Sequence, residues 1–169
     1  MDAAIIYETA WGNTKAIAAA VGEGLSSWLD VNILNVATAP PAETLRSHLL
    51  IVGAPTHAFG LSRPQTREDA GRRGGDPPAI GLREWIEAAD HVRLPVAAFD
   101  THVLHPKLPG AASRTAAKLL RRRGATLLTA PETFYVEGYQ GPIVSGEVER
   151  ARTWGKDLAA RLPEATGAL

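Results

Sequence analysis

Residues 4–17 read AIIYETAWGNTKAI, and this stretch decides the fold. An apolar run too short for a helix gives way to small, hydroxyl, glycine and amide residues, and apolar residues then recur at helical spacing from Ile17 to Trp28. The pattern predicts a strand, a tight loop and a helix. Because the start of a helix exposes unpaired backbone N–H groups and the positive end of the helix dipole, the loop from Thr9 to Thr14 is a candidate anion site.

The side chains of this loop offer neutral hydrogen-bond donors rather than charge. Thr9, Asn13 and Thr14 can donate to an anion, whereas the nearest cation, Lys15, lies beyond the loop. The phosphate-binding patterns G-x-x-x-x-G-K-[ST] and G-x-G-x-x-G are both absent. From this segment alone a simpler alternative stays open, in which Gly12 and Asn13 form an ordinary turn and Thr14 caps the helix.

The composition indicates one globular domain and limits its chemistry. The 169 residues, 45% of them hydrophobic, suffice for one domain with a sizeable core, which we place at residues 1–169. The 18 basic and 18 acidic residues cancel, so nothing points to nucleic acid or to a polybasic membrane contact. Because the chain has no cysteine, thiol redox chemistry, disulfides and thiolate metal sites are excluded, and any redox role needs a bound cofactor.

The N-terminus shows no targeting signal. Met1 and Asp2 lead directly into the first apolar run, which lacks the basic flank of a signal peptide and the length of a membrane span. We therefore expect a cytoplasmic protein that inserts into no membrane.

Strands and helices alternate along the rest of the chain. Further apolar runs lie at residues 31–36, 49–52, 94–99 and 126–129, the last extending toward 136, and their near-continuous apolar character is typical of strands covered on both faces. Helical spacing follows at 82–89, at 112–120 with Gly124 after the helix end, and at 146–162 with Ser145 as N-cap. The alternation predicts an α/β fold: a three-layer α-β-α sandwich around a five-stranded parallel sheet in the order 2-1-3-4-5.

Three loops are expected to meet at one edge of this sheet, at residues 9–14, 54–79 and 101–110. Ligands of doubly wound sheets bind outside the carboxyl ends of the strands, beside the first strand. The second loop is unusually long for such a connection, as functional loops often are, and its part 66–78 reads only as polar and rich in glycine and arginine. The third strand ends in Val52-Gly53-Ala54, which excludes the phospho-acceptor domain of response regulators, because that domain needs an aspartate there.

With these loops in this order, the chain resembles the flavodoxin family over nearly its whole length. The family's phosphate loop is matched by Thr9-Ala10-Trp11-Gly12-Asn13-Thr14, with one more residue before the glycine than in its shortest versions. The turn beside the isoalloxazine ring, G-x-P-T-x-x-x-G, is matched by Gly53-Ala54-Pro55-Thr56-His57-Ala58-Phe59-Gly60. The loop over the other ring face is resembled by Asp100-Thr101-His102, followed by Gly110-Ala111-Ala112.

The resemblance implies that the cofactor is FMN. Backbone N–H groups and side chains of the first loop would hold the phosphate, and the other two loops would hold the ring. Next to Gly60, a peptide would change orientation as the ring atom N5 gains a proton, because glycine permits this at little steric cost. The implied cofactor-binding residues are Thr9, Ala10, Trp11, Gly12, Asn13, Thr14, Pro55, Thr56, His57, Ala58, Phe59, Gly60, Asp100, Thr101, His102 and Gly110. We predict neither a catalytic residue nor a metal site.

The chain departs from electron-carrier flavodoxins in its ring contacts. The usual stacking tyrosine of the third loop is missing, with His102 or Val103 in its neighbourhood. The second loop offers Phe59 or His57 in place of tryptophan, and Trp11 would give aromatic cover nearer the phosphate. His57 either faces the flavin, where its titration would tune the redox potential with pH, or is an ordinary turn residue.

The charge near the expected ring side also differs, because carrier flavodoxins are markedly acidic. Basic side chains gather here instead, namely Arg63, Arg67, Arg72, Arg73, His102, His105 and Lys107. As a basic rim they would dock an acidic protein partner or attract an anionic substrate. In the alternative, the arginines pair locally with Glu68, Asp69 and Asp76, and such exposed pairs contribute little.

These features lead to one main interpretation and two alternatives. The main interpretation is an FMN-binding electron-transport protein that passes electrons between redox partner proteins, a reductase and an acceptor. The first alternative is an FMN-dependent oxidoreductase of the quinone reductase type, linked to NAD(P)H or quinol and acting on a quinone or a small anionic substrate. The second alternative is a binding module that has the fold but no flavin. The sequence does not decide whether the chain is an enzyme.

Overall fold

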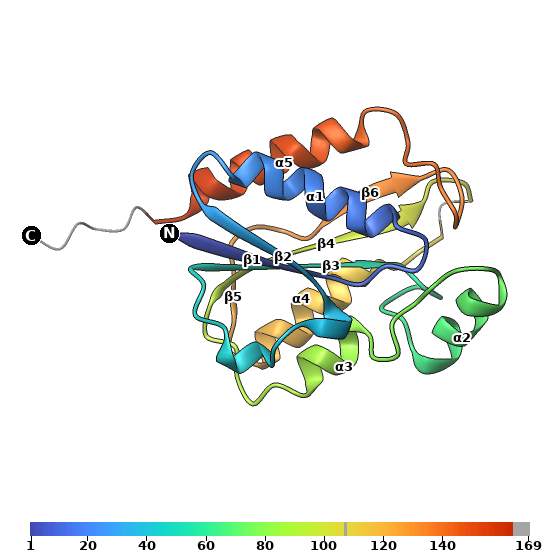
Figure 1. Cartoon of the computed structure of the whole chain (residues 1–169), viewed down its shortest axis with the longest axis horizontal. Coiled ribbons are helices and arrows are strands. Elements are labelled where there is room, and N and C mark those ends of the chain that lie inside the picture. The colour runs from blue at the N-terminus through green and yellow to red at the C-terminus, as the bar shows by residue number, and fades with distance from the viewer. Residues whose placement is uncertain (107, 164–169) are drawn as a thin grey trace, which may run out of the picture.

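A parallel sheet lies between two helical layers in the computed structural model, which describes residues 1–106 and 108–163 (Figure 1). The strands are β1 (Asp2–Tyr7), β2 (Asp30–Asn35), β3 (Leu49–Pro55), β4 (Pro95–Val103), β5 (Thr126–Leu127) and β6 (Glu132–Val136). The α-helices are α1 (Asn13–Leu25), α2 (Pro64–Arg72), α3 (Leu82–Glu87), α4 (Ala112–Arg122) and α5 (Glu147–Arg161). Helices α1 and α5 cover one face of the sheet, α3 and α4 cover the other, and α2 lies apart at one end.

The sheet order is β2-β1-β3-β4-β5, and all neighbouring strands are parallel. The predicted order 2-1-3-4-5 and the α/β class are therefore confirmed. Because the strands run in one direction, β1, β3 and β4 finish at the same edge of the sheet, and the loops that follow them meet there.

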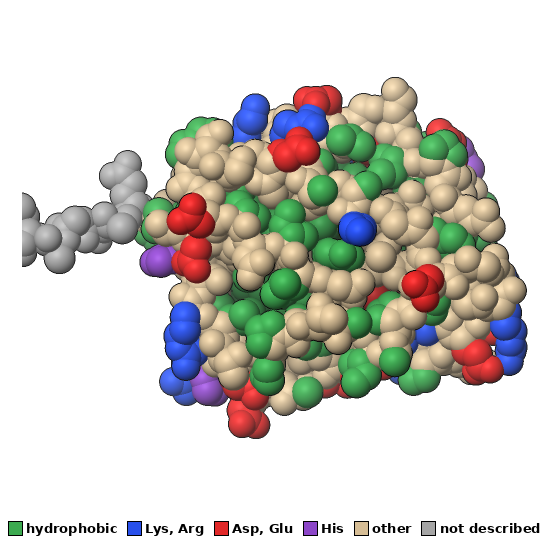
Figure 2. Space-filling model, viewed as in Figure 1, with side chains coloured by type: hydrophobic (Ala, Val, Ile, Leu, Met, Phe, Trp, Pro, Cys, Tyr) green, Lys and Arg blue, Asp and Glu red, His purple; other side chains and the backbone are tan. Residues whose placement is uncertain are grey.

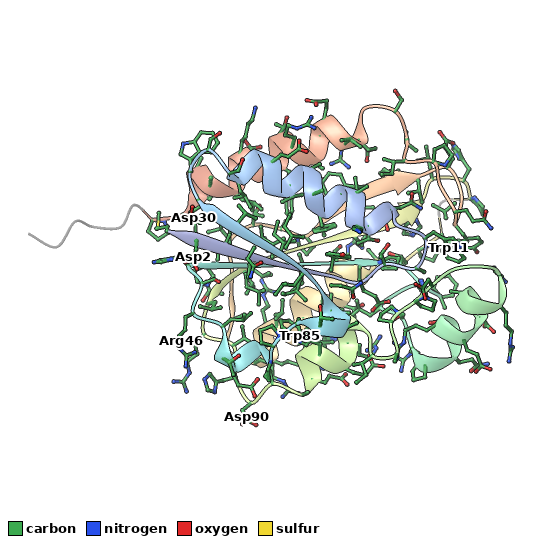
Figure 3. All side chains as sticks on the ribbon, in the orientation of Figure 1. Asp2, Trp11, Asp30, Arg46, Trp85 and Asp90 are labelled. Carbon is green, nitrogen blue, oxygen red and sulfur yellow. The ribbon has the colours of Figure 1, made fainter. Side chains whose placement is uncertain are left out.

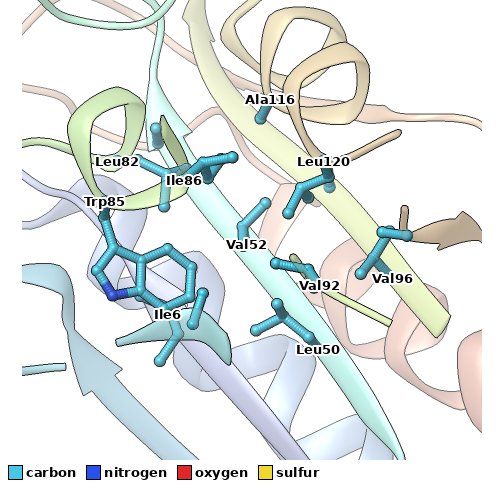
Figure 4. Close-up of a cluster of buried hydrophobic side chains, with 14 of the residues drawn as sticks. Ile6, Leu50, Val52, Leu82, Trp85, Ile86, Val92, Val96, Ala116 and Leu120 are labelled. Atoms are coloured by element: carbon cyan, nitrogen blue, oxygen red, sulfur yellow. The ribbon is translucent and has the colours of Figure 1, made fainter. Parts of the chain in front are cut away.

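The core beneath α3 and α4 consists of interleaved aliphatic side chains and the indole of Trp85 (Figure 4). Leu50 and Val52 from β3 are fully buried, and Ile86 and Leu120 cover them from the two helices. Burial of each such side chain stabilises the fold by about 1.5–3 kcal/mol. This core fixes the position of α4, whose N-terminus contacts the candidate site.

The opposite core is aromatic and brings two helices very close together. Phe99, Phe134 and Trp154 meet edge to face, with ring centroids 5.9 to 6.1 Å apart. Above them, α1 and α5 touch at two glycines: a Cβ on Gly24 would lie 2.0 Å from the carbonyl oxygen of Arg152, and one on Gly155 would lie 2.3 Å from that of Val21. Only glycine fits at these two positions without moving a helix.

The last strand is not continuous as predicted. Leu127 pairs with Val96 and Glu132 pairs with Phe99, so residues 128–131 lie opposite only residues 97–98 of β4. The strand is therefore split into β5 and β6, both paired with β4, by a bulge at the edge of the sheet.

Three helix predictions also need correction. Helix α2 overlaps residues 66–78, the segment interpreted only as polar, because residues 64–72 carry almost no apolar pattern. Helix α1 ends at Leu25, and Trp28 lies beyond it with 59% of its surface exposed. The N-cap of α5 is Gly146, in the left-handed conformation, rather than Ser145.

The sheet edge formed by β2 is turned toward the viewer in Figures 1 and 2. Hydrophobic groups gather near the middle of this face, whereas most charged side chains lie closer to its margin. Ile33 of β2 has 37% of its area exposed. Asp2 and Asp30 lie at one end of the molecule and Trp11 at the other, near α2 (Figure 3).

Candidate functional site

The first loop joins β1 to α1 and leaves backbone donors unpaired. Gly12, the N-cap of α1, has φ +94°, and its N–H donates to Thr9 Oγ1 over 2.9 Å. In the part of the chain that the structure describes, no acceptor pairs with the N–H groups of residues 13–15. These three amides and the dipole of α1 form an environment that suits an anion.

Thr14 is buried at the start of the helix and faces the third loop. Its hydroxyl lies 2.9 Å from the hydroxyl of Thr101 at the end of β4, and only 1% of Thr14 is exposed. This hydrogen bond ties the first loop to the third. Thr14 therefore does not act as the helix cap considered from the sequence, because Gly12 occupies that position.

The second loop makes a tight turn in which two non-glycine residues adopt left-handed backbone. His57 N–H donates to Gly60 O over 2.8 Å and Gly60 N–H to His57 O over 3.1 Å, while Ala58 has φ 44° and Phe59 has φ 75°. Such residues store of order 1–3 kcal/mol each, and stored strain of this kind clusters at functional sites. The sequence prediction placed the special backbone position at Gly60, whose φ is not positive. It belongs to Ala58 and Phe59 instead.

The third loop supports this turn directly. Gly110 has φ +86°, and a Cβ there would lie 2.1 Å from the carbonyl oxygen of Phe59. The two loops thus touch backbone to backbone, at a position where a side chain would collide.

Two further predicted residues hold α4 in place. Thr56 Oγ1 accepts the N–H of Ala112 over 3.0 Å, and Asp100 Oδ2 accepts the N–H of Ser113 over 2.9 Å. Both bonds satisfy donors of the first turn of α4. Asp100 is fully buried, and this burial raises the pKa of its carboxyl group. It stands below the site and borders neither of the cavities described next.

Two adjoining cavities fill the space between the loops, at the carboxyl ends of β1, β3 and β4. The larger has a volume of about 400 Å³, within the usual range for ligand sites. Beside the first loop it passes into a recess of about 30 Å³. The predicted residues that line one or both are Thr9, Ala10, Trp11, Asn13, Pro55, Thr56, His57, Ala58, Phe59, Thr101 and His102. The predicted residues that line neither are Gly12, Thr14, Gly60, Asp100 and Gly110.

A fourth loop, after β6, completes the wall and was missed by the sequence analysis. Tyr139 lines both cavities, and its ring lies 6.3 Å from that of Trp11 at an angle of 36°. The guanidinium of Arg73 stands 5.4 Å from the centroid of the Tyr139 ring. The available signal was an aromatic residue in the loop after the last strand, because that strand also finishes at the ligand-binding edge.

Trp11 has an unpaired donor between the two cavities. Its indole Nε1 is buried and bonds to no group among the described residues. A buried N–H without a partner is costly, so this donor would be stabilised by an acceptor brought close to it. An aromatic wall beside a recess that includes Asn13, at the start of α1, suits a planar ring that carries a phosphate.

Comparisons with known proteins bear on the fold. No family model matches the chain, and no curated protein matches it. Among solved structures, a flavodoxin from the domain Archaea matches with TM-score 0.70 and 21% identity over 96% of this chain and 99% of its own. Flavodoxin 2 from Bacillus cereus matches with TM-score 0.72 and 21% identity over 95% of this chain and 99% of its own. A flavodiiron core from Synechocystis gives TM-score 0.64 and 20% identity, over 96% of this chain and 36% of that one.

This chain has the flavodoxin-like fold. Within residues 1–106 and 108–163, no helix has the length and apolar character needed to cross a membrane. The same residues contain no cluster of three or more metal-ligating side chains.

Only part of the predicted basic rim borders the two cavities. Arg67 is only 4% exposed and is paired with Glu84, so its assignment to the rim is wrong. Arg72 pairs with Glu68 over 2.6 Å on the surface of α2, which is the local pairing considered as the alternative. Arg73 does line the larger cavity, as do His102 and His105, whereas exposed Arg63 does not and Lys107 lies outside the described residues.

Arg67 belongs to a buried polar network that holds the second loop. Its Nη1 donates to Ser62 Oγ over 2.9 Å, and Ser62 Oγ donates to Glu8 Oε2 over 2.6 Å. Glu8 Oε1 accepts the N–H of Leu82 over 2.8 Å. Burial raises the pKa of the Glu8 carboxyl. The network joins the end of β1 to α2 and α3, and so positions the wall of the cavity that α2 provides.

His57 lines both cavities and lies 3.3 Å from Thr66 Oγ1 through its Nδ1. Burial, followed by the nearby charge of Arg67, lowers the pKa of His57. The imidazole is therefore neutral at pH 7, and it offers the cavity one donor or acceptor without a charge.

Proposed function

We propose that this chain binds FMN in the two joined cavities and transfers electrons between protein partners. The observation that carries the proposal is the position of Asn13, the first of three residues at the start of α1 with unpaired amides, which lines the recess directly beside an aromatic-walled cavity of about 400 Å³. A phosphate and a large ring need these two environments side by side. Support also comes from the structures that the chain resembles, several of which are flavodoxins.

Each part of FMN has a counterpart among the residues. The phosphate would meet the amides of residues 13–15 and the side chains of Thr9 and Asn13, which line the recess. The ring would border Trp11 and the turn at Phe59. Bound FMN would supply reversible uptake and release of electrons. The chain's own contribution is to orient the ring, exclude water from one side and set the polarity around it.

A carrier role fits the titratable groups that the described residues place around the larger cavity. The titratable side chains on the cavity wall are His57, Asp69, Arg73, His102, His105, Glu137 and Tyr139. The neutral His57, the buried His102 and the exposed groups suit tuning of the cofactor rather than a reaction of their own. The partners would be a reductase and an acceptor protein of unassigned identity.

The second candidate is an FMN-dependent oxidoreductase that acts on a quinone or a small anion. One observation favours it: Arg73 lines the larger cavity and places a fixed positive charge at its wall. A cation there would attract an anionic substrate and stabilise negative charge on a reduced ring.

Flavin titration and turnover together test the proposal. When FMN is titrated with apoprotein, the flavin fluorescence should be quenched and the flavin visible absorption should shift, with one site per chain. The loaded protein should accept electrons from a reductase yet oxidise NADH and NADPH only slowly by itself. Fast NAD(P)H oxidation by the protein alone would contradict the carrier function and favour the oxidoreductase. Failure to bind FMN would leave a binding module that has the fold without flavin.

A further inference from the structure

A basic groove runs along α4, away from the flavin site. We call it the α4 groove; it has a volume of about 670 Å³ and is lined by Arg114, Ala117, Lys118, Arg121, Leu127, Thr129, Ala130 and Pro131. One wall is α4 and the other is the bulge that separates β5 from β6. None of these residues lines the two cavities, so the inference below does not rest on the proposed function.

The three cations of the α4 groove share one face of the helix. Arg114, Lys118 and Arg121 are spaced by four and three residues, which aligns them on an α-helix. At a rise of 1.5 Å per residue, they are separated by about 6 Å and about 4.5 Å along the axis. Among the described residues, none of the three forms an ion pair, and no acidic side chain lines the groove.

The opposite wall supplies neutral donors. The bulge takes residues 129–131 out of the sheet, and in the described chain the N–H groups of Thr129 and Ala130 meet no acceptor. The hydroxyl of Thr129 is a further donor. With cations on one wall and amides on the other, the groove presents hydrogen-bond donors and suits a ligand that carries acceptor oxygens. Its floor is apolar, at Ala117, Leu127 and Pro131.

We propose that the α4 groove binds an extended acidic segment of a partner protein. In an extended chain, alternate side chains lie about 6.5 Å apart on one side, close to the spacing of Arg114 and Lys118. Small apolar side chains at alternate positions would rest on the floor, and the carboxylates between them, pointing the opposite way, would meet the long, exposed Arg and Lys side chains at the mouth of the groove. Backbone carbonyls that point sideways would accept from Thr129 and Ala130.

Two other classes of partner fit less well. Single-stranded nucleic acid is bound where aromatic side chains stack on bases, and no aromatic residue lines the α4 groove. A membrane surface requires a convex face with protruding apolar side chains. The exposed large hydrophobic residues of the described chain all lie elsewhere.

The test uses the full chain and a labelled peptide of alternating glutamate and alanine, with a glutamine–alanine peptide beside it. Fluorescence anisotropy at low salt should show saturable binding of the glutamate peptide and none of the glutamine peptide. Arg114→Gln, Lys118→Gln and Arg121→Gln combined should weaken binding about tenfold and flatten its salt dependence. The matched control combines Lys15→Gln, Lys156→Gln and Arg161→Gln, which removes equal charge from exposed residues of α1 and α5; it should change affinity less than about twofold.

Several results would overturn the proposal. They are the absence of peptide binding at low salt, an equal loss in the groove and control variants, or tighter binding of a single-stranded oligonucleotide that the groove variant abolishes. Circular dichroism of each variant shows that it remains folded. Because these side chains are exposed on the surface, neutral replacements leave the core intact.

Discussion

Alanine at position 110 would test how the second and third loops hold the ring end of the cavity. The added Cβ would lie 2.1 Å from Phe59 O, whereas ordinary contact begins at 3.4 Å, so the two loops must separate by about 1 Å. In addition, φ +86° is a left-handed conformation, which costs a residue with a Cβ about 1–2 kcal/mol. We expect Gly110→Ala to lower the free energy of unfolding by about 2–4 kcal/mol in total.

Gly124→Ala separates the two contributions. Gly124 follows α4 with φ +96°, but a Cβ there would meet nothing closer than Val92 O at 3.8 Å. This control should therefore lose only the backbone part, about 1–2 kcal/mol, or roughly 2–8 °C in melting temperature for a chain of this size. It lies away from the cavities and should leave flavin affinity unchanged.

Urea denaturation and flavin titration give the outcome. Gly110→Ala should be less stable than Gly124→Ala. It should also weaken the binding of FMN and of riboflavin by the same factor, because the turn borders the ring that the two flavins share. Equal stability of the two variants, with normal flavin binding in both, would refute the backbone contact between Gly110 and Phe59.

Three further predictions use the same assays. Thr9→Val removes a hydroxyl at the recess and should weaken FMN binding about tenfold while riboflavin binding changes little. Thr14→Val removes a hydroxyl that is buried against the third loop, and should mainly lower the free energy of unfolding, by about 1 kcal/mol. Arg67→Gln leaves a buried network without its cation and should lower the free energy of unfolding by about 3 kcal/mol. Arg72→Gln, on the surface, should lower it by less than about 0.5 kcal/mol, and equal losses in the two variants would contradict the buried pair. Burial and a nearby charge hold the pKa of His57 in the native protein below 6.5, so the unfolded chain binds a proton at higher pH than the folded one. The free energy of unfolding should therefore fall as the pH drops from 6.5 to the native pKa. His57→Gln should make that fall shallower, and an unchanged pH profile would contradict the prediction.

The sheet and its order were predictable because buried strands leave a strong pattern. Continuous apolar runs at residues 49–52 and 94–99 mark strands covered on both faces, and the structure places them at the centre of the sheet. Helix α2 left no such pattern, because it has one buried alanine, Ala70, and is held by the polar contacts of Arg67. Those contacts join residues far apart in the sequence, which no local pattern reveals.

The site residues were predicted from their order along the chain, and only the structure shows how they lie relative to one another. Gly60 was expected to be the flexible turn residue because glycine tolerates positive φ, yet tertiary contacts force that conformation on Ala58 and Phe59. The four arginines of residues 63–73 looked equivalent in sequence. Folding buries Arg67, pairs Arg72 locally and leaves Arg73 at the cavity, because successive residues of a helix point in different directions.

The most direct test of the account compares FMN with riboflavin on the same apoprotein. The account predicts that FMN binds at least about a hundredfold more tightly, because the phosphate gains charge-assisted hydrogen bonds from the amides of residues 13–15, each worth about 1.5–3 kcal/mol. Fluorescence quenching measures both affinities in one series. Equal affinities would show that the first loop holds no phosphate, and would contradict the central claim.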